Sequence, residues 1–389
     1  MAEELVGPSV FSYNLTVETP IDIDEMIYIL SPEDLPMLGG VNSDGFPVLP
    51  SSPVGDTTFY WLEDEVPLPR GTLNEDLDGS ETDVTMATGD AVKFAVGDGI
   101  RIDAEVMIVT AVNPSTEVLT VSRGSASETN TTAATHTTGA EVIGLGTILI
   151  EGAVGSANFQ GRDKYSNYCQ IWTKKINMSR TEQSIKKYGV PSEWARQLKN
   201  AIHHAAVGRE QAALYGVKHI VSATNRRQTG GAAHFLTTNV DSTTDWLTVE
   251  SIEAMQELAY NQGGSFDLVT AHPAAFAALT NTTGSERVQT VMIDDARRGR
   301  KRAQVVMTEY GEVQLVRNRW VRGTDAFALK RGNFSERKFA PMQVQKLAKT
   351  DDTDTSMMVC EGGFQVKGEA HRGRWTGPDS SRPLPADLV

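Results

Sequence analysis

The chain has 389 residues, 40% of them hydrophobic and 22% charged, a composition typical of a soluble globular protein with two or more packing units. No apolar stretch approaches the roughly 18–20 residues that span a bilayer, and the first 20 residues lack the basic and apolar regions of a secretion signal. The two cysteines, Cys169 and Cys360, lie far apart and outside any CxxC motif, which argues against a disulfide scaffold and a thiolate zinc site.

Charge is unevenly distributed along the chain. Residues 1–160 contain 26 acidic and 4 basic residues, a net charge of −22, whereas residues 161–389 contain 24 acidic and 32 basic residues, a net charge of +8. One interpretation is a pair of solvated faces. The other, which we favour, is a protein that packs against copies of itself, because an acidic surface on one copy and a basic surface on the next orient subunits as they associate.

The first part of the chain is predicted to be extended and then to form a small β module. Residues 31–56 carry five prolines and four glycines, which favour turns and extended segments, and residues 57–66 are predicted to form the first strand. Residues 82–146 consist of short apolar runs separated by turn signals, so we expect a β-barrel or sandwich with its own core. Its strands are expected at 91–94, 98–112, 117–124 and 140–146.

The alternation of side chains predicts the two faces of the second of these strands. Ile100, Ile102, Val106 and Ile108 are expected on one face, and the charged side chains are expected on the opposite face. The charged set is Arg101, Asp103 and Glu105.

The second half of the chain is predicted to combine long strands with a long helix. Residues 147–160 and 165–180 are expected as long strands, and residues 191–216 as a helix capped by Ser192. Apolar residues recur along this helix at three- and four-residue steps, which predicts one buried stripe about 35 Å long. The core positions expected in the stripe are Trp194, Leu198, Ile202 and Ala205.

An α/β unit and further strands are predicted to follow. Residues 246–281 are expected to form a helix capped by Thr248, a buried strand and a second helix starting at Pro273. Beyond residue 304 the pattern favours long strands, with a hairpin around Tyr310 and Gly311.

Sequence motifs of catalysis and of cofactor binding are absent. The chain contains no Walker A motif, no GxGxxG after a strand, no HExxH, no calcium loop and no GxSxG. The seven histidines show no metal-ligand spacing. A Ser-His-Asp group assembled from distant positions stays open as an alternative. We therefore expect no catalysis, no cofactor and no metal.

One basic run, "ARRGRKR" at residues 296–302, concentrates five cations in six residues. Such a run suits a phosphate backbone or an acidic protein surface. No aromatic residues are interleaved for base stacking, so sequence-specific reading of nucleic acid is not expected. A solvated loop and an inter-subunit contact stand as equal alternatives, ahead of direct DNA contact.

The order of elements resembles the major capsid proteins of tailed phages with the Hong Kong 97-type fold. The resemblance covers nearly the whole chain and rests on "LPMLGG…TTFYWLEDEV" near the start and "YGEVQLVRNRWVRGTDAFALKRGNFSERKFAPMQVQKLAKT" near the end. It implies an α+β fold with a small all-β insertion domain. The implied domains are an N-terminal arm at 1–50, an extended loop at 51–81 and 147–187, the insertion at 82–146, a peripheral domain with a spine helix at 188–245 and 303–389, and an axial domain at 246–302.

The resemblance also implies function, partners and location. The protein is expected to be a structural, non-catalytic capsid protein that assembles with itself, as hexamers and pentamers, into an icosahedral shell around phage DNA. Portal, scaffold and decoration proteins are further candidate partners, packaged double-stranded DNA is expected in non-specific proximity, and no membrane is involved. We expect assembly in the host cytoplasm and residence in the virion. The expected inter-subunit contact residues are Arg297, Arg298, Arg300, Lys301, Arg302, Lys174, Lys175, Glu63, Asp64 and Glu65.

Some members of this fold cross-link their subunits through a lysine and an asparagine. Lys174 and Lys175 lie on the expected extended loop, but neither an asparagine partner nor a catalytic carboxylate is identifiable, so this chemistry is not carried over to the chain. The main alternative is a phage decoration or tail protein whose β module binds host carbohydrate or receptor. A hydrolase with an unrecognised triad is the third hypothesis.

Overall fold

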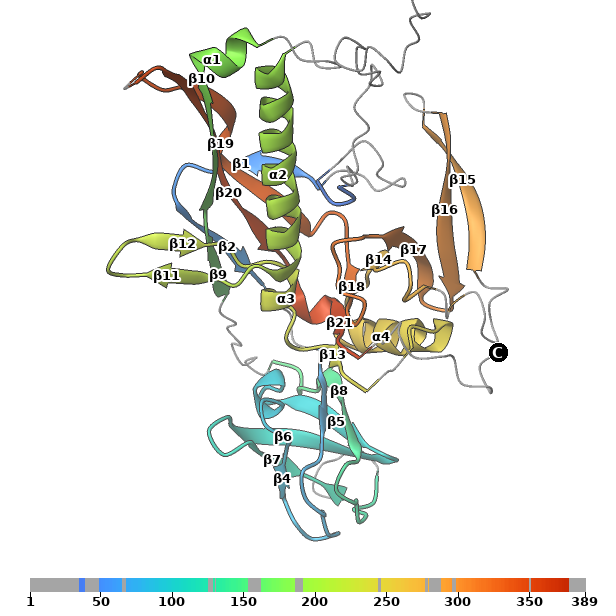
Figure 1. Cartoon of the computed structure of the whole chain (residues 1–389). Helices are drawn as coiled ribbons and strands as arrows, with labels where there is room; N and C mark the ends of the chain where they lie inside the picture. Colours follow the sequence, from blue (N-terminus) through green and yellow to red (C-terminus); the bar gives the residue numbers. More distant parts are fainter. Residues whose placement is uncertain are drawn as a thin grey trace, which may run out of the picture. The chain divides into compact units, whose positions relative to one another are not determined.

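The computed structural model describes residues 35–38, 49–64, 68–124, 129, 131–152, 162–185, 192–243, 246–276, 279, 288–295, 299–349 and 351–377, with the backbone alone for 288–295 and 299–303. The chain divides into two compact units (Figure 1). Unit 1 comprises residues 1–60 and 166–389, and unit 2 comprises residues 61–165. The chain leaves unit 1 along β2 (Thr58–Glu63) and returns along β9 (Asp163–Tyr168), and these two strands pair.

Unit 2 is a six-stranded antiparallel sheet that closes on itself. Its strand order is β3-β8-β5-β6-β7-β4. The two edges meet through an antiparallel bridge between Leu73 and Met86, with Asn74 N–H donating to Thr85 O at 2.9 Å. A small barrel therefore encloses a separate apolar core. The strands are β3 (Arg70–Thr72), β4 (Asp83–Thr85), β5 (Asp98–Ile102), β6 (Glu105–Asn113), β7 (Val118–Ser122) and β8 (Glu141–Thr147).

Two local predictions for unit 2 are wrong. Residues 91–93 form a short 3₁₀ helix, η2 (Ala91–Lys93), instead of a strand. The expected strand 98–112 is a hairpin, because Asp103 adopts a left-handed φ of 50° and a two-residue turn separates Ile102 from its partner Glu105. The turn shifts the alternation by one residue, so Glu105 and Met107 are buried where Val106 and Ile108 were expected.

The sheet of unit 2 also begins earlier than the 82–146 expected for the module. Strand β3 pairs with β8, and Leu73 and Leu77 belong to the same buried core. The strand expected over 147–160 is not seen where the structure describes it: β8 ends at Thr147 and residues 148–150 are irregular. Residues 153–160 lie outside the described part.

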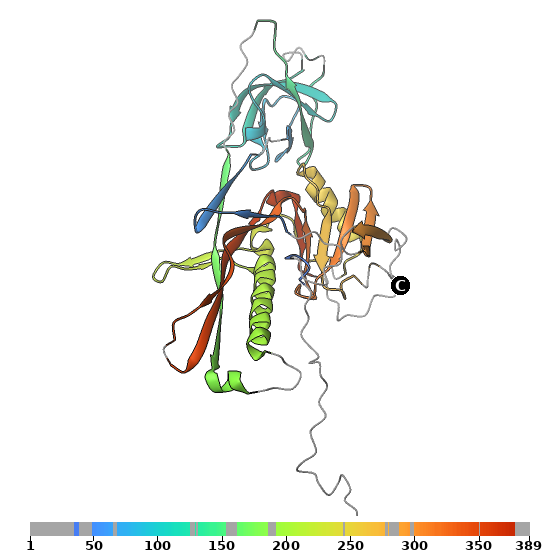
Figure 2. The same ribbon diagram turned by 90° about the horizontal axis from the view of Figure 1, so that it is seen from above.

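The first layer of unit 1 is a four-stranded sheet in the order β1-β19-β20-β10. The long helix α2 (Glu193–Tyr215) lies along it in both views (Figures 1 and 2). The sheet joins distant parts of the sequence, since β10 pairs with β20 over its whole length and β1 pairs with β19. The strands are β1 (Ser51–Pro53), β10 (Gln170–Ser179), β19 (Phe334–Lys346) and β20 (Thr353–Val366).

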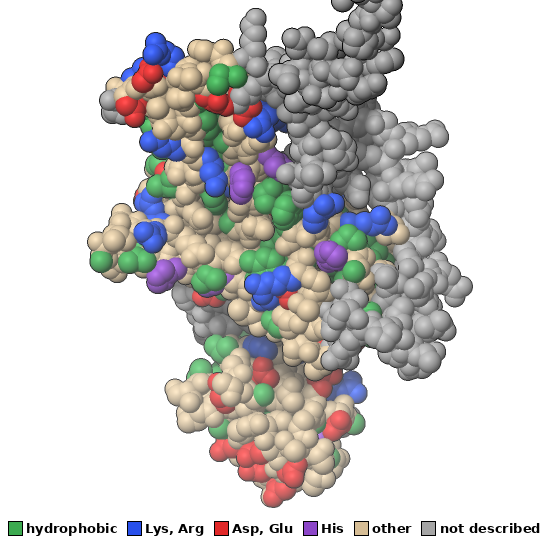
Figure 3. Space-filling view, in the orientation of Figure 1, with side chains coloured by type: hydrophobic (Ala, Val, Ile, Leu, Met, Phe, Trp, Pro, Cys, Tyr) green, Lys and Arg blue, Asp and Glu red, His purple; other side chains and the backbone are tan. Residues whose placement is uncertain are grey.

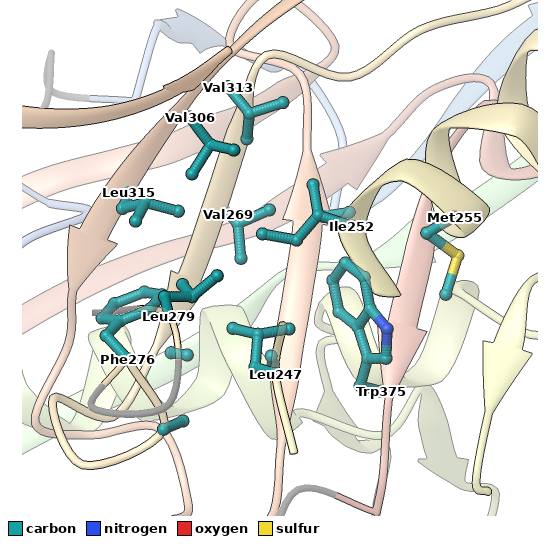
Figure 4. Packing of buried hydrophobic residues seen from close by; sticks show 14 of the residues in the cluster. Leu247, Ile252, Met255, Val269, Phe276, Leu279, Val306, Val313, Leu315 and Trp375 are labelled. Atoms are coloured by element: carbon teal, nitrogen blue, oxygen red, sulfur yellow. The ribbon is translucent and has the colours of Figure 1, made fainter. Parts of the chain in front are cut away.

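The second layer of unit 1 is a seven-stranded sheet in the order β13-β21-β18-β14-β17-β16-β15. Helix α4 (Val249–Asn261) packs on this sheet through a large buried cluster that includes Ile252, Val269 and Trp375 (Figure 4). The strands are β13 (Val240–Asp241), β14 (Leu268–Ala271), β15 (Val288–Asp295), β16 (Gly299–Thr308), β17 (Gly311–Arg317), β18 (Ala326–Leu329) and β21 (Gly373–Trp375). The remaining elements are α1 (Arg180–Ser184), β11 (His219–Val221), β12 (Arg226–Gln228), α3 (Ala232–Phe235) and η5 (Glu369–His371).

Several local predictions for unit 1 are confirmed. Ser192 caps α2 by accepting a hydrogen bond from Ala195 N–H, and Thr248 caps α4 in a capping box with Ser251. β14 is buried along its whole length, and β16 and β17 form the expected hairpin.

No helix among the described residues is long and apolar enough to cross a membrane.

The expected core stripe of α2 is buried over only part of the helix. Of its four positions, Ala205 is buried, Trp194 and Leu198 are half-buried, and Ile202 is 37% exposed. The completely buried positions lie toward the C-terminal end, where α2 packs against the apolar cluster of unit 1. In the isolated subunit, therefore, the N-terminal half of α2 is not a core element.

Candidate functional site

A groove of about 670 Å³ between β10 and the N-terminal half of α2 is the first candidate. Lys174 and Lys175 are exposed on β10 and line it, opposite Glu193 and His204 of α2. The lining is mainly polar, and the groove is open, unlike the apolar enclosed pockets that bind small molecules. Its shape and chemistry suit contact with another polypeptide.

The three acidic residues expected at contacts between subunits, Glu63, Asp64 and Glu65, belong to unit 2. Glu63 accepts a hydrogen bond from Trp61 Nε1 at 2.8 Å, and Asp64 forms an exposed ion pair with Arg162 at 3.4 Å, so both have contacts within unit 2. Exposed pairs of this kind contribute little stability. Glu65 lies outside the described residues.

The basic run is only partly described. Arg297 and Arg298 lie outside the described residues. The backbone of Arg300, Lys301 and Arg302 belongs to β16, where these residues pair with Asp294, Ile293 and Met292 of β15. The expected loop is therefore a strand from Gly299 onward.

A buried carboxylate on α2 holds the start of the described chain. Glu210 has no exposed surface, and its two oxygens accept hydrogen bonds from Met37 N–H at 2.9 Å and Leu38 N–H at 3.0 Å. Asn318 Nδ2 also donates to it at 3.0 Å. The side chain of Met37 is fully buried in the adjoining apolar cluster. A buried carboxylate is stable when such donors replace its hydration, so Glu210 anchors residues 35–38 to α2. Sequence reasoning missed this contact.

A second buried ionic group lies in unit 2. Arg123 and Glu105 form a bidentate pair, with Arg123 Nη2 and Nε at 2.7 and 3.0 Å from the two carboxylate oxygens. The other N–H groups of Arg123 donate to the carbonyl oxygens of Asp78, Glu81 and Ala134. All the donors of the guanidinium group are therefore used, which makes its burial tolerable.

The same carboxylate contacts a buried histidine. His136 Nε2 lies 3.1 Å from Glu105 Oε2, and His136 Nδ1 lies 2.8 Å from Asp103 Oδ2. Burial acts to raise the pKa of Glu105. Hydrogen bonds from Arg123, the Ala134 N–H and His136, together with the charge of Arg123, outweigh burial and lower that pKa. The carboxylate is therefore held in its charged form.

The group resembles a catalytic acid–base pair, but its contacts are structural. A pocket of about 360 Å³ opens beside His136, and the Thr131 hydroxyl that lines it is bonded to the backbone of Val106. The oxygens of Glu105 are occupied by Arg123, Ala134 and His136.

Burial raises the pKa of the Cys169 thiol in unit 1 to about 11, so this thiol is not an activated nucleophile. Among the described residues no cluster of His, Cys, Asp or Glu is suited to a metal.

Comparisons with known proteins identify a matching family and solved structures of similar fold. The family model of the SU10 major capsid protein matches residues 9–379. No curated protein matches the chain. Among solved structures, the capsid of Myoviridae phage XM1 is 10% identical with a TM-score of 0.50, the match covering 95% of this chain and 99% of that one. The structure titled Microbacterium phage Oxtober96 is also 10% identical, with a TM-score of 0.48 and coverage of 94% and 97%.

The XM1 likeness shows the fold, and it confirms the α+β capsid fold expected from the Hong Kong 97-type resemblance. The family assignment replaces the alternatives of a decoration protein, a tail protein and a hydrolase. Its members form the protein shell of the virion, a structural role that requires association between copies. The match extends over nearly the whole chain, and the chain belongs to the SU10 major capsid protein family.

Proposed function

We propose that the subunit builds an icosahedral, DNA-filled head from rings of five and six copies. The observation that carries the proposal is the anchor at Glu210. It holds residues 35–38, which lie within the arm expected at 1–50, against α2. We infer that the arm, which this anchor attaches to the subunit, contacts a neighbouring copy.

We assign the arm, the insertion and the two domains of a capsid subunit to parts of this chain. Residues 1–50 form the arm, and unit 2 is an insertion in the extended loop, entered along β2 and left along β9. The four-stranded sheet with α2 is the peripheral domain. The seven-stranded sheet with α4 contains the axial domain expected at 246–302. The closed core of unit 2 supports its assignment as an insertion, since it includes no residue of unit 1.

Charge supports the contact between copies. Residues 61–165 contain 17 acidic and 6 basic residues, whereas residues 166–389 contain 23 acidic and 30 basic residues. On the face shown in Figure 3, Asp and Glu side chains gather at one end of unit 2, and Lys and Arg side chains are spread over unit 1. We infer that acidic unit 2 of one copy meets a basic surface of a neighbour. Packaged double-stranded DNA, a portal, and scaffold or decoration proteins are further proposed partners, and assembly takes place in the host cytoplasm.

Overexpression of the full chain followed by sedimentation velocity and electron microscopy tests this function. Shells, sheets or capsomers are the expected products, and their yield should fall as salt screens the charged surfaces. A compact monomer at high concentration in low salt, with native circular dichroism, would contradict the proposal.

A further inference from the structure

Two tyrosines form an exposed aromatic surface on unit 1. Tyr260 in the last turn of α4 is 65% exposed, and Tyr310 in the turn between β16 and β17 is 39% exposed. Their ring centroids lie 5.6 Å apart. The hydroxyl of Thr308 lies 2.5 Å from Gln256 Oε1 and 2.7 Å from Gly311 O, so it connects the hairpin turn to α4 and fixes this arrangement. We call Tyr260 and Tyr310 the tyrosine platform.

Carboxylates flank the tyrosine platform. Glu257 lies one turn before Tyr260 on the same side of α4, and Glu309 precedes Tyr310 in the turn; both are exposed. In the part of the chain that the structure describes, neither carboxylate has an ion-pair partner. An exposed aromatic pair beside unpaired carboxylates matches the guanidinium group, which stacks on an aromatic face while its N–H groups reach a carboxylate. Tyrosine is also enriched where proteins associate.

The chain itself supplies a segment of this chemistry. The run at 296–302 contains Arg297, Arg298, Arg300, Lys301 and Arg302. The backbone of its described part, residues 299–302, lies in the half of β16 away from the tyrosine platform of its own subunit. β16 begins at Gly299, inside the run, and ends at Thr308, beside the platform. The ten residues of this strand span about 30 Å from Gly299 to Thr308, and the backbone of Arg302 lies about 20 Å before Thr308. The ribbon of β15 and β16 extends away from α4 (Figure 1), and pairing with β15 and β17 holds β16 extended.

We propose that the tyrosine platform binds the basic run, residues 296–302, of a second copy of this chain. The contact joins two different surfaces of the same subunit, so it is head-to-tail, and repetition of such a contact closes a ring. The inference rests on the proposed assembly into rings, and it identifies one contact that holds neighbours within a ring. Arginine, rather than lysine, is the main residue of the run, as stacking on tyrosine requires.

Charge reversal on each side tests the contact. A platform variant carries Glu257→Lys and Glu309→Lys, and a run variant carries Arg297→Glu and Arg298→Glu. Each variant alone is expected to raise the concentration needed for half-maximal assembly by about tenfold. The platform variant sets two lysines against the basic run, and the run variant sets two glutamates against Glu257 and Glu309 and leaves three cations in the run. A chain that carries all four changes is expected to return to within about threefold of wild type. Glu312→Lys is the control on the same hairpin. The neighbouring Val313 is buried in the cluster that includes α4, so the exposed side chain of Glu312 points to the face of the hairpin away from α4 and from the tyrosine platform.

Mixing the two variants gives a second, geometric readout. A ring of six can alternate platform and run variants so that every contact joins opposite charges, whereas a ring of five cannot alternate. The mixture is therefore expected to recover six-membered rings and sheets without closed shells. Tyr260→Ala with Tyr310→Ala should weaken assembly, and the two Tyr→Phe changes should not, because the ring face is retained.

The outcomes separate this contact from the proposed function. If wild type forms shells and both charge-reversal variants assemble at the wild-type concentration, the contact is wrong and the function stands. Failure of the fourfold variant to recover, with native circular dichroism, also overturns the contact. If wild type forms only small oligomers that the single variants abolish and the fourfold variant restores, the contact is upheld without the shell. A wild type that does not self-associate at all overturns both.

Discussion

The two units of the subunit are built from strands at very different distances along the chain. In unit 2, β5, β6 and β7 follow one another as neighbouring hairpins. In unit 1, Ser51 pairs with Glu336 and Gln170 pairs with Gly362, so its first sheet is completed only when the last third of the chain is in place. Local pairings cost less loop-closure entropy and form faster than distant ones. Unit 2 is therefore expected to fold independently, and unit 1 to fold as a whole or not at all.

The most deeply buried carboxylate that the structure describes in each unit is held differently, although unit 1 also contains a largely buried ion pair between Arg209 and Glu336. Unit 2 buries opposite charges together, with Arg123 against Glu105. Unit 1 surrounds the carboxylate of Glu210 with neutral donors from Met37, Leu38 and Asn318. In each unit, the hydrogen bonds of the buried charged group join segments of the chain that do not pair with each other as strands. The comparison predicts that the two units respond separately to truncation, substitution and acid.

The largest effect is expected from truncation after Gly332. This removes β19, β20 and β21 and leaves β1, β10 and β18 without strand partners that they have in the full chain. Unit 1 should lose its cooperative unfolding transition, while unit 2 keeps its own. Hydrogen exchange resolved by peptide would measure this as lost protection at 166–332 and retained protection at 70–147. Equal loss of protection in both units would break the comparison.

Arg123→Ala is the largest single substitution expected in unit 2. It leaves Glu105 buried without its cation, which costs about 3–5 kcal/mol of unfolding free energy. Urea unfolding followed by exchange at residues 70–147 would measure it, with unit 1 as the internal control. The double change Arg123→Met with Glu105→Met removes both charges and should cost less than Arg123→Ala alone. A single substitution with no effect would show that the pair is not a structural support.

Local elements of this fold could be predicted from sequence because their signals are local. Ser192 and Thr248 cap the helices as expected, and the turn at Tyr310 and Gly311 lies where the pattern breaks. The buried pair in unit 2 could not be found in this way. Glu105 was expected with the charged face of a continuous strand, and the turn at Asp103 placed it in the interior instead.

The anchor at Glu210 shows the same limit more clearly. Glu210 and Met37 are 173 residues apart, and their hydrogen bond uses a backbone N–H that no side-chain motif reports. A charged residue within an apolar helical stripe is a weak signal, since such residues also face solvent. The tyrosine platform likewise depends on two rings brought together by the sheet. Tertiary pairing, which a single sequence does not encode as a pattern, decides each of these sites.

Glu210→Ala is expected to destabilise unit 1 by about 3 kcal/mol, since Met37 N–H, Leu38 N–H and the Asn318 amide lose their acceptor. Thermal unfolding and limited proteolysis would measure it, with faster cleavage around residues 35–38. Glu193→Ala is a control on the same helix, because Glu193 lies in the first, partly exposed turn. Unchanged cleavage would mean that the buried apolar side chains alone hold the segment.

A smaller, pH-dependent difference between the units is expected in acid. The pKa of Glu105 in the folded chain lies below its ordinary value of 4.5, so its contribution to stability is present above pH 4.5 and is lost as pH falls through the folded pKa. The unfolding free energy of unit 2 should therefore decrease below pH 4.5. Glu105→Gln should be less stable at neutral pH and show a flatter dependence. An unchanged slope in Glu105→Gln would assign the acid sensitivity to other carboxylates.

The smallest effect is expected when unit 2 is removed at the right boundary. Asp64 and Arg162 form an ion pair at 3.4 Å beside the paired strands β2 and β9, so a linker of about four Gly and Asn residues can replace residues 65–161. Unit 1 should then unfold within a few degrees of its original temperature by calorimetry, because its two apolar clusters contain no residue of unit 2. Deletion of 82–146 is the instructive contrast. It leaves Leu73 and Leu77 exposed without β8, and should yield an aggregating chain. If both deletions behave alike, unit 2 is not an independent insertion and the comparison between the units fails.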